Sequence, residues 1–322
     1  GANTSVQNRQ RAKARQEVLA HLQEPDVLSQ RLFTLTAPTG IGKTLTALDF
    51  ALGLRDQIAQ AERHQPAIIY ALPFVNIISQ SLQVYEAVLG KQARVLGHYQ
   101  YADLFGDERT APGGEEALLA RSDLEQLLDQ RKQSMESWQA DVIVTSFVQL
   151  LHTLIGHRNK LLKKFHHLAG SILILDEVQN IDLQQLPLVG AMLYSLSELL
   201  NVRVLVMTAT RPRLYALAWE HILQHRKVPK PLPRELLADH SHYFNSLERT
   251  QIIPNLSLRE ESSDWLDFIG HTWQPHCSAL LVVNTVGRSL ELYELLREYL
   301  LGEGYENPLF YLSTNLSPAH RI

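Results

Sequence analysis

Short apolar runs alternate with longer amphipathic stretches along most of the chain. The runs are rich in branched side chains and have the length of buried strands, which predicts strands at 32–36, 67–72, 94–97, 142–145, 172–175 and 203–207. Helical patterns fall between them, at 44–54, 75–88, 116–131 and 183–199. Buried strands that alternate with helices predict an α/β fold in which a parallel sheet is covered on both faces.

The pattern breaks at residues 228–233, where alternating prolines exclude a regular helix or a central strand. A second strand–helix–strand unit is predicted beyond the break, at 279–284, 288–301 and 309–312. Because a pair of strands makes only a marginal sheet, we expect this second domain to be incomplete. The predicted division is a first domain at 1–213, a linker at 214–260 and the N-terminal part of a second domain at 261–322.

Composition narrows the classes of protein that the chain can belong to. The 322 residues include one cysteine, Cys277, which excludes disulfides, thiolate zinc sites and iron–sulfur clusters within the chain. A net charge of −4 argues against a histone-like binder but leaves room for a local groove that holds nucleic-acid phosphates. No apolar run approaches the roughly 20 residues that span a bilayer, and no signal-peptide pattern opens the chain. We therefore expect a cytoplasmic protein without a membrane segment.

A candidate phosphate-binding loop (P-loop) follows the first predicted strand. It reads Ala37, Pro38, Thr39, Gly40, Ile41, Gly42, Lys43 and Thr44. Backbone N–H groups of such a turn wrap a phosphate, the lysine reaches the outer phosphates, and the threonine hydroxyl can bind Mg²⁺. The helix that begins there also points the positive end of its dipole at the anion. The full pattern has glycine where this chain has Ala37, and the alternative is a glycine turn before an ordinary helix.

An acidic pair, Asp176 and Glu177, ends another predicted strand. Acidic pairs are common at strand ends, so this pair indicates a catalytic site only in combination with the candidate phosphate-binding loop upstream. Parallel sheets bind ligands at the C-terminal ends of their strands, where both segments are expected to lie. Asp176 would then hold Mg²⁺, and Glu177 would polarise the attacking water. Together the two segments predict a nucleoside triphosphatase site with ATP and Mg²⁺ as cofactors and with Lys43, Asp176 and Glu177 as catalytic residues.

Further polar residues follow other predicted strands. Each one alone has a plainer interpretation as a cap that starts a helix. Their order along the chain favours a nucleic-acid motor instead, because all of them are expected at the sheet edge that carries the phosphate loop. The residues are Pro73, Asn76, Thr145, Ser146, Thr208 and Thr210.

In these segments the chain resembles the superfamily 2 helicases. More narrowly, it is similar to the helicase part of the CRISPR-associated type I helicase–nuclease effector. The segments that carry the resemblance are 35–44, 71–78, 175–179, 208–210 and 312–321. This family implies RecA-like lobes that close on ATP and translocate along single-stranded DNA from 3′ to 5′. The expected fold is therefore a RecA-like P-loop NTPase lobe followed by an incomplete second RecA-like lobe.

The resemblance also implies roles for individual residues. Lys43 would contact the phosphates, Thr44 and Asp176 would bind Mg²⁺, and Glu177 would act as base. Residues implied in coupling hydrolysis to DNA movement are Gln179, Thr208 and Thr210, and Gln179 stands where many relatives carry histidine. Residues implied in DNA contact are Pro73, Asn76, Thr145, Ser146, Asn284, Thr285, Ser313 and Thr314.

Departures from the family pattern shape the expected partners and activity. No His-Asp dipeptide occurs, so we expect the metal-dependent nuclease to be supplied by another domain or subunit. The last helicase motifs would lie beyond Ile322, so we expect weak ATP binding and slow hydrolysis from these 322 residues alone. The expected partners are single-stranded DNA and a CRISPR surveillance complex. The alternatives are another superfamily 2 DNA or RNA helicase, or a nucleotide-gated adaptor without turnover.

Overall fold

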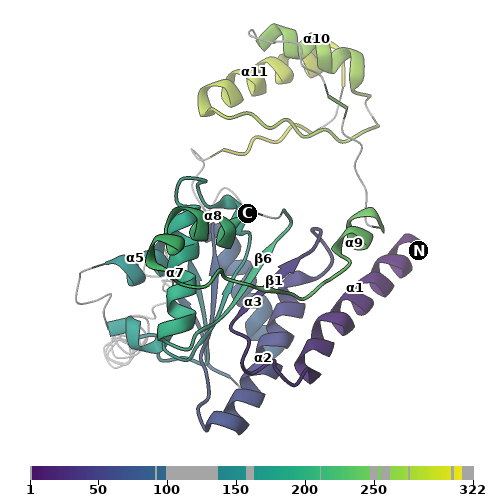
Figure 1. The fold of residues 1–322 in the computed structure, drawn as a ribbon. Helices are drawn as coiled ribbons and strands as arrows, with labels where there is room; N and C mark the ends of the chain where they lie inside the picture. The colour runs from purple at the N-terminus through teal and green to yellow at the C-terminus, as the bar shows by residue number, and fades with distance from the viewer. Residues whose placement is uncertain are drawn as a thin grey trace, which may run out of the picture. The chain divides into compact units, whose positions relative to one another are not determined.

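The computed structural model describes residues 2–90, 93–98, 137–156, 163–210, 212–246, 253–254, 262–274, 276–305 and 308–313. The chain divides into two compact units, residues 1–249 and residues 250–322 (Figure 1). The predicted helix at 116–131 lies outside the described residues. Within them, no helix is long and apolar enough to cross a bilayer.

The first unit is built on a seven-stranded sheet with the strand order β3-β4-β2-β5-β6-β1-β7. All of its strand pairs are parallel. The strands are β1 (Leu32–Thr36), β2 (Ile68–Leu72), β3 (Val95–His98), β4 (Val142–Ser146), β5 (Ile172–Leu175), β6 (Arg203–Thr208) and β7 (Arg234–Glu235). The strands expected between residues 32 and 207 are confirmed within a residue or so at each end. The predicted α/β fold with a parallel sheet is confirmed.

Helices cover both faces of this sheet. One face carries α1 (Ala2–Ala20), α2 (Lys43–Glu62) and α3 (Val75–Leu89), and the other carries α5 (Phe147–Ile155), α7 (Leu186–Leu199) and α8 (Leu214–His221) (Figure 1). Short 3₁₀ turns lie at η1 (His21–Gln23), η3 (His166–Leu168), η4 (Val178–Asn180) and η5 (Leu223–Arg226). The two buried faces explain why the strands are apolar at nearly every position rather than at alternate ones.

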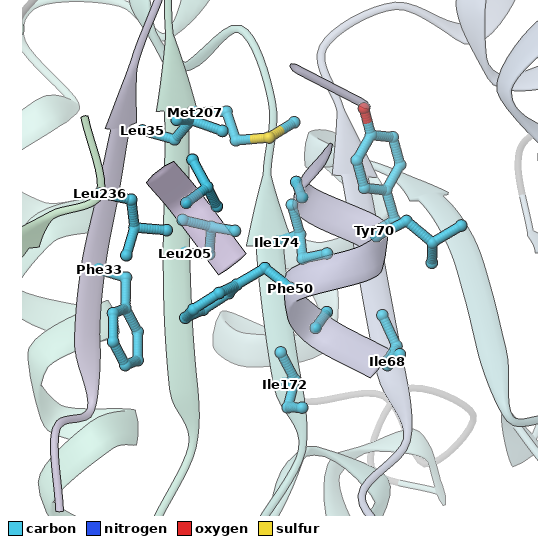
Figure 2. Packing of buried hydrophobic residues seen from close by; sticks show 14 of the residues in the cluster. Phe33, Leu35, Phe50, Ile68, Tyr70, Ile172, Ile174, Leu205, Met207 and Leu236 are labelled. Atoms are coloured by element: carbon cyan, nitrogen blue, oxygen red, sulfur yellow. The ribbon is translucent and has the colours of Figure 1, made fainter. Parts of the chain in front are cut away.

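Side chains alternate between two cores because successive strand residues point to opposite faces. Ile172 and Ile174 pack under α2, whereas Leu173 and Leu175 pack under α7. Figure 2 shows the first core, in which Phe50 of α2 lies against the strands. Each fully buried aliphatic or aromatic side chain contributes about 1.5–3 kcal/mol. The core therefore fixes the register of the strands, and this register determines where the loops at the strand ends lie.

The first compact unit extends to residue 249 and so includes most of the residues expected to form a linker. β7 pairs in parallel with β1, and α9 (His240–Ser246) follows it. The Glu235 carboxylate accepts hydrogen bonds from the Thr36 N–H at 2.9 Å and from the Thr36 hydroxyl at 2.7 Å. Leu236 and Leu237 are fully buried in the core. These contacts bind the segment after the prolines to the sheet, which sequence periodicity alone did not indicate.

The second unit contains α10 (Ser262–Thr272) and α11 (Val286–Gly302). The predicted helix at 288–301 is confirmed within α11. The predicted strands at 279–284 and 309–312 are not formed in the described residues. A strand needs hydrogen-bonded neighbours, and here alternate apolar side chains remain exposed, such as Leu280 and Phe310. The apolar runs at 279–284 and 309–312 therefore form no sheet within the described residues of this unit.

Candidate nucleotide site

The loop between β1 and α2 has the backbone conformation that its glycines permit. Gly40 has φ +83° and Gly42 has φ +92°, in the left-handed region that L side chains rarely adopt. A Cβ on Gly42 would meet no atom within 4 Å, so conformation rather than space requires glycine there. Ala37 is fully buried, and its N–H donates to the Thr208 carbonyl at 3.1 Å. An alanine is thus accommodated at the position where the full pattern has glycine.

Lys43 begins α2 and is buried within the site. Its Nζ donates a 2.9 Å hydrogen bond to the Ala37 carbonyl, across the loop that Pro38, Thr39 and Ile41 complete. Burial lowers the pKa of Lys43, while the charges of Glu177 and Asp176 oppose that shift. The structure therefore brings the loop lysine and the acidic pair together, as the sequence predicted.

Asp176 follows β5 and is 5% exposed. Its Oδ2 accepts a 2.5 Å hydrogen bond from the Tyr70 hydroxyl, and its Oδ1 accepts one of 2.8 Å from the Glu177 N–H. Burial raises the pKa of Asp176, the Tyr70 hydrogen bond opposes this, and the Glu177 charge adds to it. A bound cation would favour the ionised form, because an opposite charge nearby stabilises a carboxylate.

Glu177 adopts a left-handed backbone, with φ 55° and ψ 41°, immediately before η4. Such a conformation costs a non-glycine residue about 1–3 kcal/mol. Its carboxylate accepts a hydrogen bond from the Gln179 side-chain amide. The backbone turn thus directs Glu177 and Gln179 toward each other rather than along the strand axis.

Gln179 continues this chain of contacts to the end of β6. Its Oε1 accepts a 2.8 Å hydrogen bond from the Thr208 hydroxyl. The Thr210 N–H donates to the same hydroxyl at 3.0 Å. The structure therefore places the three residues expected in coupling, Gln179, Thr208 and Thr210, in one hydrogen-bonded network with Glu177.

The residues expected to contact DNA lie in more varied surroundings. Thr145 and Ser146 end β4 with buried side chains, and the Ser146 hydroxyl caps α5 by accepting from the Gln149 N–H at 3.2 Å. Pro73 is half-buried after β2, and the side chain of Asn76 lies outside the described part. Ser146 therefore has the capping role that was the plainer interpretation, and DNA contact by this set stays a prediction.

In the second unit, Asn284 and Thr285 are exposed, and the Thr285 hydroxyl caps α11 through the Arg288 N–H at 3.3 Å. Ser313 is half-buried, and Thr314 falls beyond the described residues. The roles proposed for these residues by resemblance also stay predictions.

Tyr70 and Arg11 also contact the site, and sequence reasoning missed Tyr70. Tyr70 of β2 binds Asp176, and Arg11 of α1 donates from Nε to the Gly40 carbonyl at 2.8 Å. The strand period could have revealed Tyr70, because residues 70 and 176 fall on the same face of neighbouring strands.

The donors at this site suit Mg²⁺, which prefers oxygen ligands and keeps several waters. Thr44 and Asp176 supply a hydroxyl and a carboxylate. The described residues contain no cluster of three or more His, Cys, Asp or Glu that could hold a metal by itself. A hydroxyl and a carboxylate are a ligand set that suits Mg²⁺ when substrate phosphates supply further oxygen ligands.

Comparison with known proteins agrees with this geometry. Residues 13–217 match the DEAD/DEAH box helicase family. The CRISPR-associated nuclease/helicase Cas3 of Haloferax volcanii is 30% identical over 217 residues, which cover 64% of this chain and 22% of that protein. The chain thus spans about a fifth of the length of this curated relative.

Solved structures show the same fold at low identity. The ATP complex of T. fusca Cas3 is 19% identical with a TM-score of 0.59, over 94% of this chain and 36% of that one. The DNA complex of the DUF1998 helicase MrfA is 15% identical with a TM-score of 0.53, over 97% of this chain and 39% of that one. The family match, which covers more than half of the chain, and the curated relative show that the chain belongs to the DEAD/DEAH box helicases of superfamily 2 and is related to Cas3.

Proposed function

We propose that the first unit binds ATP with Mg²⁺ and drives translocation along single-stranded DNA in CRISPR interference. The observation that carries this proposal is the network from Glu177 through Gln179 to Thr208, beside the buried Lys43 and Asp176. Solved T. fusca Cas3 structures include ATP and ADP complexes, and a MrfA structure includes DNA, which supports both ligands.

Each residue has a distinct role in the proposed reaction. The Lys43 ammonium and the N–H groups of the loop bind the phosphates, and their charge stabilises the transferring phosphoryl group. Thr44 and Asp176 would hold Mg²⁺, which would neutralise charge that develops on the phosphate oxygens. Glu177 orients and polarises the attacking water.

Hydrolysis would be coupled to movement through hydrogen bonds that change with the nucleotide. Gln179 contacts Glu177 on one side and Thr208 on the other, so a change at the phosphate reaches the end of β6 directly. Alternating grip on DNA by the two units would then give directional stepping. Further partners under this proposal are a CRISPR surveillance complex and a nuclease domain or subunit, and such a protein acts in the cytoplasm.

ATP turnover by the full-length protein, measured with and without nucleic acid, tests this function. We expect single-stranded DNA to stimulate turnover more than RNA of the same sequence, and Lys43→Ala to remove the stimulated rate. Stimulation by RNA alone would favour an RNA helicase. Nucleotide binding without any response to nucleic acid would favour the nucleotide-gated adaptor.

A further inference from the structure

Tyr70 lies beside Asp176 because of the register between β2 and β5. Tyr70 pairs with Ile174, and Asp176 lies two residues further along. Residues two apart on a strand share a face, and their diagonal neighbours lie about 7–8 Å apart, within reach of an aromatic side chain. Figure 2 shows the Tyr70 ring pointing along the strands, with its hydroxyl at the tip. The sheet therefore delivers this hydroxyl to the end of β5.

The Tyr70 ring is held in place by its surroundings. It is fully buried, and it packs edge-to-face against Tyr85 of α3 with ring centroids 5.1 Å apart. Every other residue of β2 is apolar and buried. A buried hydroxyl is costly unless it is hydrogen-bonded, so phenylalanine would suit the packing alone. The hydroxyl is explained by its contacts at the site.

The Tyr70 hydroxyl lies near both residues that are proposed to bind Mg²⁺. It donates to Asp176 Oδ2 at 2.5 Å, and the side chain of Thr44 is close enough to influence the pKa of the phenol. The Glu177 N–H binds the other carboxylate oxygen of Asp176. Each oxygen keeps a further lone pair, since an ionised carboxylate offers about four acceptor positions. The carboxylate is thus fixed from two sides and can still accept a metal or its water.

We propose that Tyr70 is a positioning residue for Mg²⁺, and this inference rests on the function proposed above. Its hydroxyl keeps the Asp176 carboxylate in one orientation at the end of β5, so that this metal ligand is already arranged when a nucleotide arrives. Partners that orient metal ligands in this way typically change metal affinity by about 10- to 100-fold when they are removed.

The chain offers a matched control in Tyr85. Its hydroxyl is also buried and lies near that of Tyr70, but it makes no hydrogen bond of acceptable geometry with the described residues. Tyr70→Phe and Tyr85→Phe therefore each remove one buried hydroxyl and keep the ring pair. Only the first change removes a contact with Asp176.

The test is equilibrium binding of fluorescent ADP at increasing Mg²⁺ concentration, with thermal unfolding as a check on folding. We expect Tyr70→Phe to raise the half-maximal Mg²⁺ concentration by about 10-fold or more. Affinity for the nucleotide in EDTA should not change, and Tyr85→Phe should match the wild-type protein throughout. Binding of Mn²⁺ to the ADP-saturated protein, followed by electron paramagnetic resonance, should show the same loss.

Two outcomes would overturn the positioning role. One is a Mg²⁺ dependence in Tyr70→Phe that equals that of Tyr85→Phe. The other is an equal loss of ADP affinity with and without Mg²⁺, which would show a structural role only. If the wild-type protein itself binds no ADP at any Mg²⁺ concentration, the proposed function fails as well, so failure of the two proposals can be told apart.

Discussion

The Thr208 hydroxyl donates a 2.8 Å hydrogen bond to the side-chain carbonyl of Gln179, and this contact joins the end of β6 to the acidic pair after β5. Gln179 uses its amide group on Glu177 at the same time. An amide can serve as donor and acceptor together without a change of protonation. The link between the two segments should therefore be insensitive to pH near neutrality, unlike one made by histidine.

Replacing Gln179 with alanine should lower DNA-stimulated ATP turnover without changing ATP binding. A hydrogen bond to a charged group contributes about 1.5–3 kcal/mol, so we expect the DNA-stimulated turnover of Gln179→Ala to fall about 10- to 100-fold. ATP affinity should stay at the wild-type value, because Gln179 is not among the residues proposed to contact the phosphates. Gln184→Ala is the control, since that side chain is exposed. An unchanged stimulated rate would remove Gln179 from the coupling path.

The left-handed backbone of Glu177 predicts that a glycine variant is more stable than an alanine variant at this position. Alanine at this position keeps the strain of the left-handed conformation, whereas glycine adopts this conformation without strain. The free energy of unfolding of Glu177→Gly should therefore be about 1 kcal/mol higher than that of Glu177→Ala. Both variants should lose ATP turnover, because neither carries the carboxylate. Chemical denaturation and phosphate release measure the two effects.

Arg63 supplies the control for this comparison, because it ends α2 with φ 54° and lies outside the nucleotide site. Arg63→Gly should likewise be more stable than Arg63→Ala, with turnover unchanged in both. If alanine and glycine are equally stable at position 177, the proposed strain is absent.

A substitution at Gly42 tests whether backbone conformation, rather than lack of space for a side chain, requires glycine in the phosphate-binding loop. A side chain in this left-handed position costs about 1–2 kcal/mol, although nothing would obstruct the added Cβ. Gly42→Ala should therefore lower both the free energy of unfolding and ATP affinity. Gly287→Ala is the matched change, since its Cβ also meets nothing within 4 Å and its φ is ordinary. Wild-type ATP affinity in Gly42→Ala would contradict the assigned loop geometry.

Asp176 and Asp141 should respond to pH with opposite signs. Burial raises the pKa of Asp176 above its ordinary value of 3.8, so the folded state favours the protonated form. Asp176 therefore costs stability once pH rises through its folded pKa, and it costs nothing below 3.8. Burial alone would also raise the pKa of Asp141, but hydrogen bonds from the Arg94 backbone and from Arg55 outweigh it and lower the pKa.

The stabilising contribution of the ionised Asp141 to the folded state is therefore fully present above pH 3.8, and it is lost as pH falls through the pKa of Asp141 in the folded protein. Unfolding in EDTA across this range should show Asp176→Asn gaining stability relative to the wild-type protein as pH rises. Asp141→Asn should lose relative stability as pH rises. Slopes of the same sign in both variants would contradict the assigned environments.

The sheet and the geometry of the candidate nucleotide site followed from local sequence pattern, whereas the limits of the two units did not. Strands apolar on both faces can only be buried, and the glycine turn restricts the backbone after β1. Neither pattern predicts the short strand β7, because β7 depends on the contacts of Glu235 with Thr36. A continuous apolar run around Leu280 predicted a strand, but strand pairing depends on neighbouring strands that a local sequence pattern does not supply.

The most direct test of the account is the affinity for an ATP analogue in the presence of Mg²⁺, measured for the wild-type protein and for Lys43→Ala. The buried ammonium of Lys43 lies in the phosphate loop, beside Asp176 and Glu177. We predict Mg²⁺-dependent binding by the wild-type protein and an affinity at least about 10-fold lower in Lys43→Ala. Equal affinities in the two proteins, or no binding by the wild-type protein, would contradict the claim that this loop is the nucleotide site.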